Sequence, residues 1–220
     1  MSTGFLKTSV GKKVLMGLTG LFLISFLVVH VSLNATVFMM DGGQTFNAGA
    51  DFMAHNPVIR IMEIVLFAGL IIHIIQALTL TLANKKARPI AYAKIDGAAN
   101  SSWYSRSMGI LGSLLLLFLV SHLSHFWIDT KIAVFKHEEH NTYLEMKEVF
   151  SQWYVVLIYL VGVIALCYHL LHGFQSAFQS LGLNHKLYTP IIKKVGVWFS
   201  IIVCLLFAAM PVCMFLNIVQ

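Results

Sequence analysis

Charged side chains are scarce in this chain of 220 residues. Only 11% of the residues are Asp, Glu, Lys or Arg, whereas 58% are hydrophobic, and the mean hydropathy is +0.80. A soluble domain usually carries roughly a quarter charged residues. The composition therefore excludes a soluble domain and predicts an all-α integral membrane protein with little mass outside the bilayer.

Cysteine is rare as well, and its spacing excludes two kinds of site. Cys167, Cys204 and Cys213 lie in apolar runs without a CxxC pattern, so we interpret them as core residues rather than as disulfides or zinc ligands. The chain also lacks a phosphate-binding loop, a dinucleotide fingerprint and a nucleophile elbow. Its net charge of +6 does not indicate a nucleic-acid partner, because the basic residues flank the apolar runs.

Five uncharged runs are each long enough to cross about 30 Å of hydrocarbon at 1.5 Å per residue. We therefore predict one membrane domain over residues 1–220, a bundle of five transmembrane helices. Their expected ranges are about 14–40, 57–84, 107–130, 152–180 and 191–217.

Basic residues are unevenly divided between the two ends of these helices. The end that includes the N-terminus carries Lys7, Lys12, Lys13, Lys85, Lys86, Arg88, Lys94, Arg106, Lys186, Lys193 and Lys194, and the other end carries Arg60, Lys131, Lys136 and Lys147. Positively charged flanks stay in the cytoplasm. We therefore expect the N-terminus in the cytoplasm and the C-terminus outside.

Histidine is the unusual polar residue within the spans, because an ionisable side chain in a membrane helix is costly and normally faces the bundle interior. Six histidines lie in the first four spans: His30, His73, His122, His125, His169 and His172. One such residue alone would be explained by a hydrogen bond to a neighbouring helix. Four helices that each supply a histidine can instead hold two haems, each with two imidazole ligands.

The depth of four histidines predicts how they pair. His30 and His122 lie 18 and 16 residues after the basic starts of two helices that run outward, and His73 and His169 lie 16 and 17 residues after the starts of two helices that run inward. Each is therefore about 24–27 Å along its helix. We predict an outer haem on His30 and His122, and an inner haem on His73 and His169.

Residues near the four predicted ligands could contact a haem or replace a ligand. Gly162 and Gly173 share the helical face of His169, which would let a flat group approach the backbone. His125 and His172 each follow a chosen ligand by three residues, so either could replace its neighbour or contact a haem. Asn34, one turn after His30, could bond a haem edge or a quinone.

One acidic residue, Glu63, lies just inside the outer end of the second span, with His55 and Asn34 expected nearby. If a quinone reacts near the outer haem, these residues are the candidates for the proton donor and acceptor that it needs at the membrane edge. Glu63 could equally form an ion pair with Arg60, three residues before it.

Several motifs occur together in a specific order. His30 is followed by Asn34 four residues later, and Arg106 is followed by Gly112 and then, ten residues later, by His122. Residues 169–182 read HLLHGFQSAFQSLG, a histidine and a glycine four residues apart in a run that ends in glycine.

Together these motifs resemble the single-chain, five-helix, dihaem cytochrome b anchor of succinate dehydrogenase and fumarate reductase. The resemblance covers almost the whole chain and implies that His169, rather than His172, is the ligand. Glu63, ten residues before His73, lies close to where related anchors carry an acid.

The resemblance implies a role in a larger respiratory complex of the bacterial cytoplasmic membrane. A flavoprotein subunit with FAD and an iron–sulfur subunit would dock on the cytoplasmic side. There residues 85–106, with Trp103, Tyr104 and Arg106, would contact the iron–sulfur subunit and the propionates of the inner haem, although the topology of the membrane helices explains the basic residues equally well. Electrons would pass through two haems b to or from a quinone, with menaquinone as the expected substrate. The chain would have no succinate chemistry of its own.

Two other functions compete with this interpretation. A dihaem cytochrome b of a hydrogenase, formate dehydrogenase or nitrate reductase would have a similar bundle and similar ligands, but another partner. A transporter that uses intramembrane histidines for metal or protons would bind no haem and would show an internal repeat or a broken helix.

Overall fold

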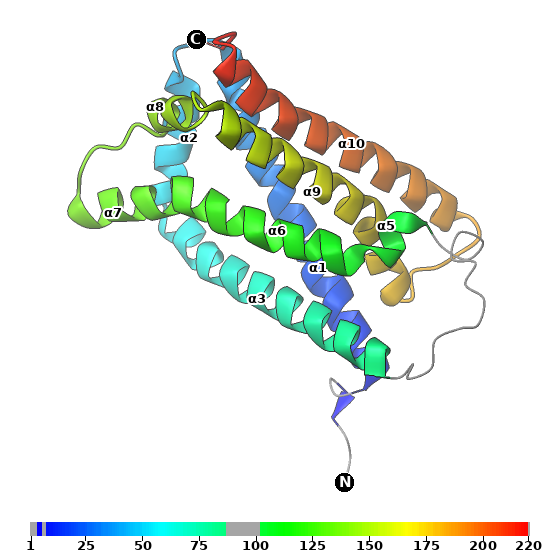
Figure 1. The fold of residues 1–220 in the computed structure, drawn as a ribbon. Coiled ribbons are helices and arrows are strands. Elements are labelled where there is room, and N and C mark those ends of the chain that lie inside the picture. Colours follow the sequence, from blue (N-terminus) through cyan, green and yellow to red (C-terminus); the bar gives the residue numbers. More distant parts are fainter. Residues whose placement is uncertain (1–3, 6–7, 87–101, 220) are drawn as a thin grey trace.

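The computed structural model describes residues 4, 5, 8–86 and 102–219, and within them the fold is entirely helical (Figure 1). The elements are α1 (Ser9–Ala35), η2 (Thr36–Met39), α2 (Gln44–His55), α3 (Pro57–Lys86), α5 (Trp103–Arg106), α6 (Met108–His122), η3 (Leu123–Trp127), α7 (Ile128–Lys136), α8 (Thr142–Val149), α9 (Trp153–Ser180) and α10 (Tyr188–Phe215). Arg88 and Lys94, two of the predicted cytoplasmic charges, lie outside these residues, as does Lys7.

Five helices are long and apolar enough to cross a membrane, as the sequence predicts. They span Ser9–Met39, Pro57–Lys86, Met108–Lys136, Trp153–Ser180 and Tyr188–Phe215. The first begins five residues earlier than predicted, because the Thr8 side chain accepts a hydrogen bond from the Gly11 amide and caps the helix. The third runs on through a π-helical turn, η3, into α7 and ends at Lys136 instead of near residue 130.

Helix α9 is the centre of the bundle, with α1, α6 and α10 packed around it (Figure 1). Helix α3 packs against α1 and α2 and has no buried residue along its length. Its side chains therefore face lipid or the bundle interior without being enclosed by neighbouring helices.

Close packing of α9 and α10 depends on a small residue. A Cβ atom on Gly196 of α10 would lie 2.7 Å from the ring of Phe174 on α9, so the absence of a side chain there makes room for the phenyl group. One turn later, the hydroxyl of the fully buried Ser200 donates a hydrogen bond to the Gly196 carbonyl at 2.7 Å. This bond satisfies the buried hydroxyl.

The largest buried cluster lies at the end of the bundle that holds the C-terminus, called here the C-terminal end. Short helices α2 and α8 pack there over the ends of α9 and α10, with Phe46, Tyr143, Phe150 and Met214 in the shared core. The sequence did not predict α2, because residues 44–55 lack a continuous apolar run. The opposite end, where α1 begins and α3 ends, is called the N-terminal end.

Two adjacent glycines in the turn before α2 allow a matched test of this cluster. Gly42 and Gly43 both have positive φ, +68° and +78°, but only a Cβ on Gly43 would collide with Tyr143, at 2.2 Å from the ring. Alanine at either position should cost about 1–2 kcal/mol for its left-handed backbone. Gly43→Ala should cost about 1–3 kcal/mol more through overpacking, measured as thermal unfolding in detergent. Equal losses in the two variants would show that Tyr143 does not hold α8 against this turn.

Candidate functional site

His30 of α1 and His122 of α6 lie next to each other inside the bundle. Their ring centroids are 5.7 Å apart, with an angle of 88° between the ring planes. Phe26 stacks on His30 at 5.3 Å, and Phe118 stacks on His122 at 5.7 Å. The structure thus brings together the two histidines that the sequence pairs towards the outside.

His73 of α3 and His169 of α9 form the second pair, with ring centroids 6.3 Å apart and ring planes at 60°. His73 also touches Thr19 of α1, whose hydroxyl oxygen lies 3.2 Å from the His73 Nδ1 atom. Thr19 precedes His30 on the same helix by 11 residues, or about 16–17 Å along the axis. The two pairs therefore lie at different levels, with His73 and His169 towards the N-terminal end.

Each pair spans helices whose backbones do not pack closely in the described part of the chain. Helix α1 packs against α3 and α9, and α6 packs against α9, whereas α1 with α6 and α3 with α9 are not packed neighbours. Each histidine contact thus joins two helices that are not packed neighbours. A group in the bundle centre would contact both members of a pair.

The distance within each pair is compatible with two imidazoles that share one metal ion. An imidazole nitrogen lies about 2 Å from a bound first-row metal ion, so two imidazoles on opposite sides of one iron have centroids about 6 Å apart. The Nδ1 atoms of His122 and His169, one in each pair, are buried without a hydrogen-bond partner. Leaving such an atom unsatisfied usually costs about 1–3 kcal/mol.

The two alternative ligands have side-chain partners. The Nδ1 atom of His125 lies 3.1 Å from the Tyr159 hydroxyl, and the two rings stack at 5.9 Å. The Nε2 atom of His172 lies 3.1 Å from the Ser176 hydroxyl on the next turn of the same helix. His125 and His172 are therefore satisfied by the protein itself, unlike His122 and His169.

The glycines near the histidines divide into two kinds. A Cβ on Gly112 would have nothing within 4 Å, and one on Gly173 would meet only His169, at 4.0 Å. The expectation for Gly162 was wrong, because a Cβ there would lie 2.4 Å from the Phe118 ring. Gly162 makes room for a phenylalanine, whereas Gly112 and Gly173 have open space beside them.

Glu63 joins α3 to the long third span at the C-terminal end. Its Oε2 accepts a hydrogen bond from Lys131 Nζ at 2.6 Å, and its Oε1 accepts one from Trp127 Nε1 at 2.5 Å. Phe67, one turn later on α3, packs against Trp127 at 5.1 Å. The expected partner Arg60 is instead directed to the Ala54 carbonyl, at 3.5 Å.

The other two residues of the predicted quinone site have local partners. His55 lies 3.0 Å from the Asp51 carboxylate on the same helix, and the Asn34 side chain donates to the His30 carbonyl at 2.8 Å. Within the described residues no hydrogen bond or ion pair joins either of them to Glu63. Their role with a quinone stays a prediction.

Three aromatic residues lie together at the N-terminal end, and one of them directly precedes His169 in the sequence. Trp103 and Tyr104 of α5 pack on Tyr168, at ring distances of 5.0 and 6.1 Å, and Tyr168 directly precedes His169. Arg106 ends this short helix. Most of the basic segment expected to bind a partner, residues 87–101, lies outside the described residues.

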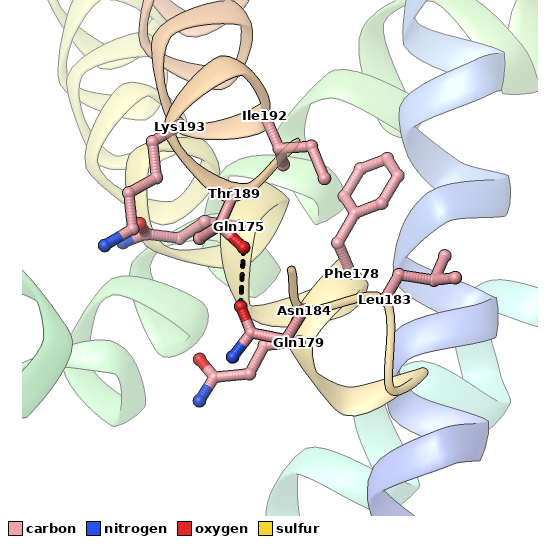
Figure 2. A pocket seen from close by; sticks show the side chains of 8 residues that line it. All are labelled: Gln175, Phe178, Gln179, Leu183, Asn184, Thr189, Ile192 and Lys193. Carbon is pink, nitrogen blue, oxygen red and sulfur yellow. Dashed lines mark hydrogen bonds between the residues drawn. The ribbon is translucent and has the colours of Figure 1, made fainter. Parts of the chain in front are cut away.

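Two hollows occur at this same end, near the turn from α9 to α10. Figure 2 shows the smaller, of about 30 Å³, where Thr189 donates its hydroxyl to the Asn184 side chain at 2.7 Å. The cavity is lined by Gln175, Phe178, Gln179, Leu183, Asn184, Thr189, Ile192 and Lys193, so no paired histidine reaches it.

Four residues that contact the bundle histidines or Glu63 were not identified as site residues from the sequence. Thr19 contacts His73, Tyr159 bonds His125 and touches His122 at 5.9 Å, and Trp127 and Lys131 hold Glu63. Thr19 had a recognisable signal, since it is a polar residue on nearly the same face of the first span as His30. The others depend on contacts between distant helices that no local pattern encodes.

No protein-family model, curated protein or solved structure matches this chain. Its site is therefore interpreted from its own residues.

A partly buried acidic residue, Glu145, lies in the short helix α8 at the C-terminal end. Glu145 of α8 bonds His140 at 3.0 Å, while its Oε1 atom is buried without a partner. Burial raises the pKa of the Glu145 carboxyl, and the negative charges of Asp129 and Glu148 raise it further, against the opposing hydrogen bond from His140.

This raised pKa predicts a pH dependence of stability. The native state binds the Glu145 proton more tightly than the unfolded chain, so this contribution is complete below the ordinary glutamate pKa and is lost as the pH rises through the native pKa. Glu145→Gln should therefore flatten the fall of the melting temperature above pH 4.5 in detergent. Glu139→Gln, at an exposed site, should keep the slope of the unmodified protein; equal slopes in all three would contradict the assignment.

Proposed function

We propose that this chain is the dihaem cytochrome b membrane anchor of a succinate:quinone oxidoreductase. The observation that supports the haem proposal is the pair of histidine contacts, with 5.7 and 6.3 Å between ring centroids, each between two helices that are not packed neighbours. The link to succinate rests on the sequence motifs around Asn34, Arg106 and His169.

In this function the imidazoles of each histidine pair would hold one haem b. A haem with two imidazole ligands transfers single electrons without binding substrate at its iron. Phe26 and Phe118, stacked on His30 and His122, keep those imidazoles in place and exclude water. Haems at these two levels, about 16 Å apart along α1, would pass electrons across the membrane.

The partners follow from the same proposal. A flavoprotein and an iron–sulfur subunit would dock at the N-terminal end, which the basic residues assign to the bacterial cytoplasm. Succinate oxidation or fumarate reduction would take place in those subunits. Menaquinone would react near the haem of His30 and His122, at the end of the bundle where Glu63 lies.

The ligand assignment predicts the selective loss of single haems. His30→Ala or His122→Ala should remove the haem towards the C-terminal end, and His73→Ala or His169→Ala the other. In each case about half of the haem b absorbance of the purified complex should disappear, because each iron needs two axial ligands.

His125→Ala and His172→Ala are the matched controls, since each lies three residues from a ligand and has a side-chain partner. Both should retain two haems. A spectrum that keeps both haems in His169→Ala, but loses one in His172→Ala, would move the ligand on α9 by three residues.

The partner proposal is tested by purifying the complex through a tag on this chain. We expect a flavoprotein with covalently bound flavin and an iron–sulfur protein to co-purify, and the complex to reduce a menaquinone analogue with succinate. Co-purification of a hydrogenase, formate dehydrogenase or nitrate reductase subunit would replace succinate by another electron donor. Purification without haem would support the transporter instead.

The quinone proposal predicts a difference between two residues that share one ion pair. Glu63→Gln should slow quinone reduction by at least tenfold, because a positioned proton-transfer group contributes about 10²–10⁴-fold. Succinate oxidation with a soluble dye should be unchanged. Lys131→Gln breaks the same ion pair but keeps the carboxylate, so it should retain most quinone activity. Equal losses in both variants would assign Glu63 a structural role.

A further inference from the structure

Thr19 is one of two buried polar residues in the described part of the chain, the other being Ser200. It lies on α1 with 8% of its surface exposed, and it faces His73 of α3. Its neighbour Gly20 also borders this ring, since a Cβ there would meet His73 Cε1 at 3.6 Å. The face of α1 formed by residues 19 and 20 is therefore packed against the imidazole.

The hydroxyl oxygen of Thr19 has three neighbours within hydrogen-bond distance. Its oxygen lies 2.9 Å from the Leu15 carbonyl and 3.1 Å from the Met16 carbonyl, both on its own helix, and 3.2 Å from His73 Nδ1. A hydroxyl has one hydrogen, and a threonine in a helix commonly donates it to a carbonyl on the preceding turn. If it does so here, the oxygen is free to accept a hydrogen bond from an Nδ1–H group of His73.

We propose that Thr19 is a positioning residue for His73, which fixes the tautomer with the proton on Nδ1 and presents Nε2 towards the bundle centre. This inference rests on the proposed haem ligation. The hydrogen bond that one ring nitrogen makes determines which nitrogen is free to bind a metal. Thr19 thereby prepares His73 as a ligand before any haem is bound.

This arrangement distinguishes His73 from the other predicted ligands. The Nδ1 atoms of His122 and His169 are buried without a partner. The contact between Thr19 and His73 also joins α1 to α3, a helix without a buried residue. His172 differs because its bond to Ser176 remains within one helix.

The inference predicts an effect on one haem only. An acceptor at Nδ1–H makes an imidazole a stronger electron donor, which stabilises ferric iron and lowers the reduction potential. Thr19→Val keeps the shape of the side chain but removes the acceptor. It should raise the midpoint potential of the haem held by His73, alter its low-temperature EPR g values and lower its affinity by about tenfold or more, while the other haem is unchanged.

Two variants of the whole complex serve as controls. Thr19→Ser keeps the hydroxyl and should restore the potential and the g values. Thr79→Val removes an exposed hydroxyl of α3 that donates only to the Ile75 carbonyl, at 2.7 Å, and should leave both haems unchanged. Unchanged potentials and EPR spectra in Thr19→Val would overturn the inference.

A measurement on the unmodified protein covers the remaining outcomes. If Thr19→Val does not accumulate, or if the purified chain contains no haem, ¹⁵N NMR of histidine-labelled protein reads the His73 tautomer directly. A proton on Nδ1 that is protected from exchange supports the role of Thr19, and a proton on Nε2 overturns it. Absence of haem alone would refute the proposed function but not the tautomer assignment.

Discussion

The cost of placing imidazoles in an apolar bundle is the constraint on which the rest of this structure depends. Each polar side chain buried among lipid-facing helices needs a partner, because hydrocarbon offers none. His125 and His172 find protein hydroxyls, whereas His122 and His169 each face another histidine and bury an unpartnered nitrogen. The imidazoles of His122 and His169 are therefore less well satisfied by the protein than those of His125 and His172.

The helices around these pairs are held by contacts of different strength. Helix α9 packs tightly on α10 through Gly196, and the C-terminal end is closed by α2 and α8. Helix α3 is held more lightly, by α1 and α2 and by the Glu63 bridge to α7. The spans that contain α3 and α6 thus have few or no buried residues, whereas α9 and α10 are the most buried of the five.

The number and type of long helices could be predicted because uncharged runs of sufficient length have one stable form in a membrane. Pairing of the histidines followed from depth, since rise per residue converts sequence position into height. Helix α2, the π-helical turn at Leu123–Trp127 and the Lys131 partner of Glu63 could not be predicted. They depend on tertiary contacts, such as the one between Tyr143 and Gly43, that no local periodicity encodes.

The central claim is that each histidine pair holds one haem b. It is tested most directly by a pyridine haemochrome assay on the purified chain, combined with quantitative amino-acid analysis. The account predicts two haems b per chain, with both irons low-spin by EPR, as expected for two imidazole ligands on each iron. A chain that is folded in detergent or membranes and contains no haem b would contradict it.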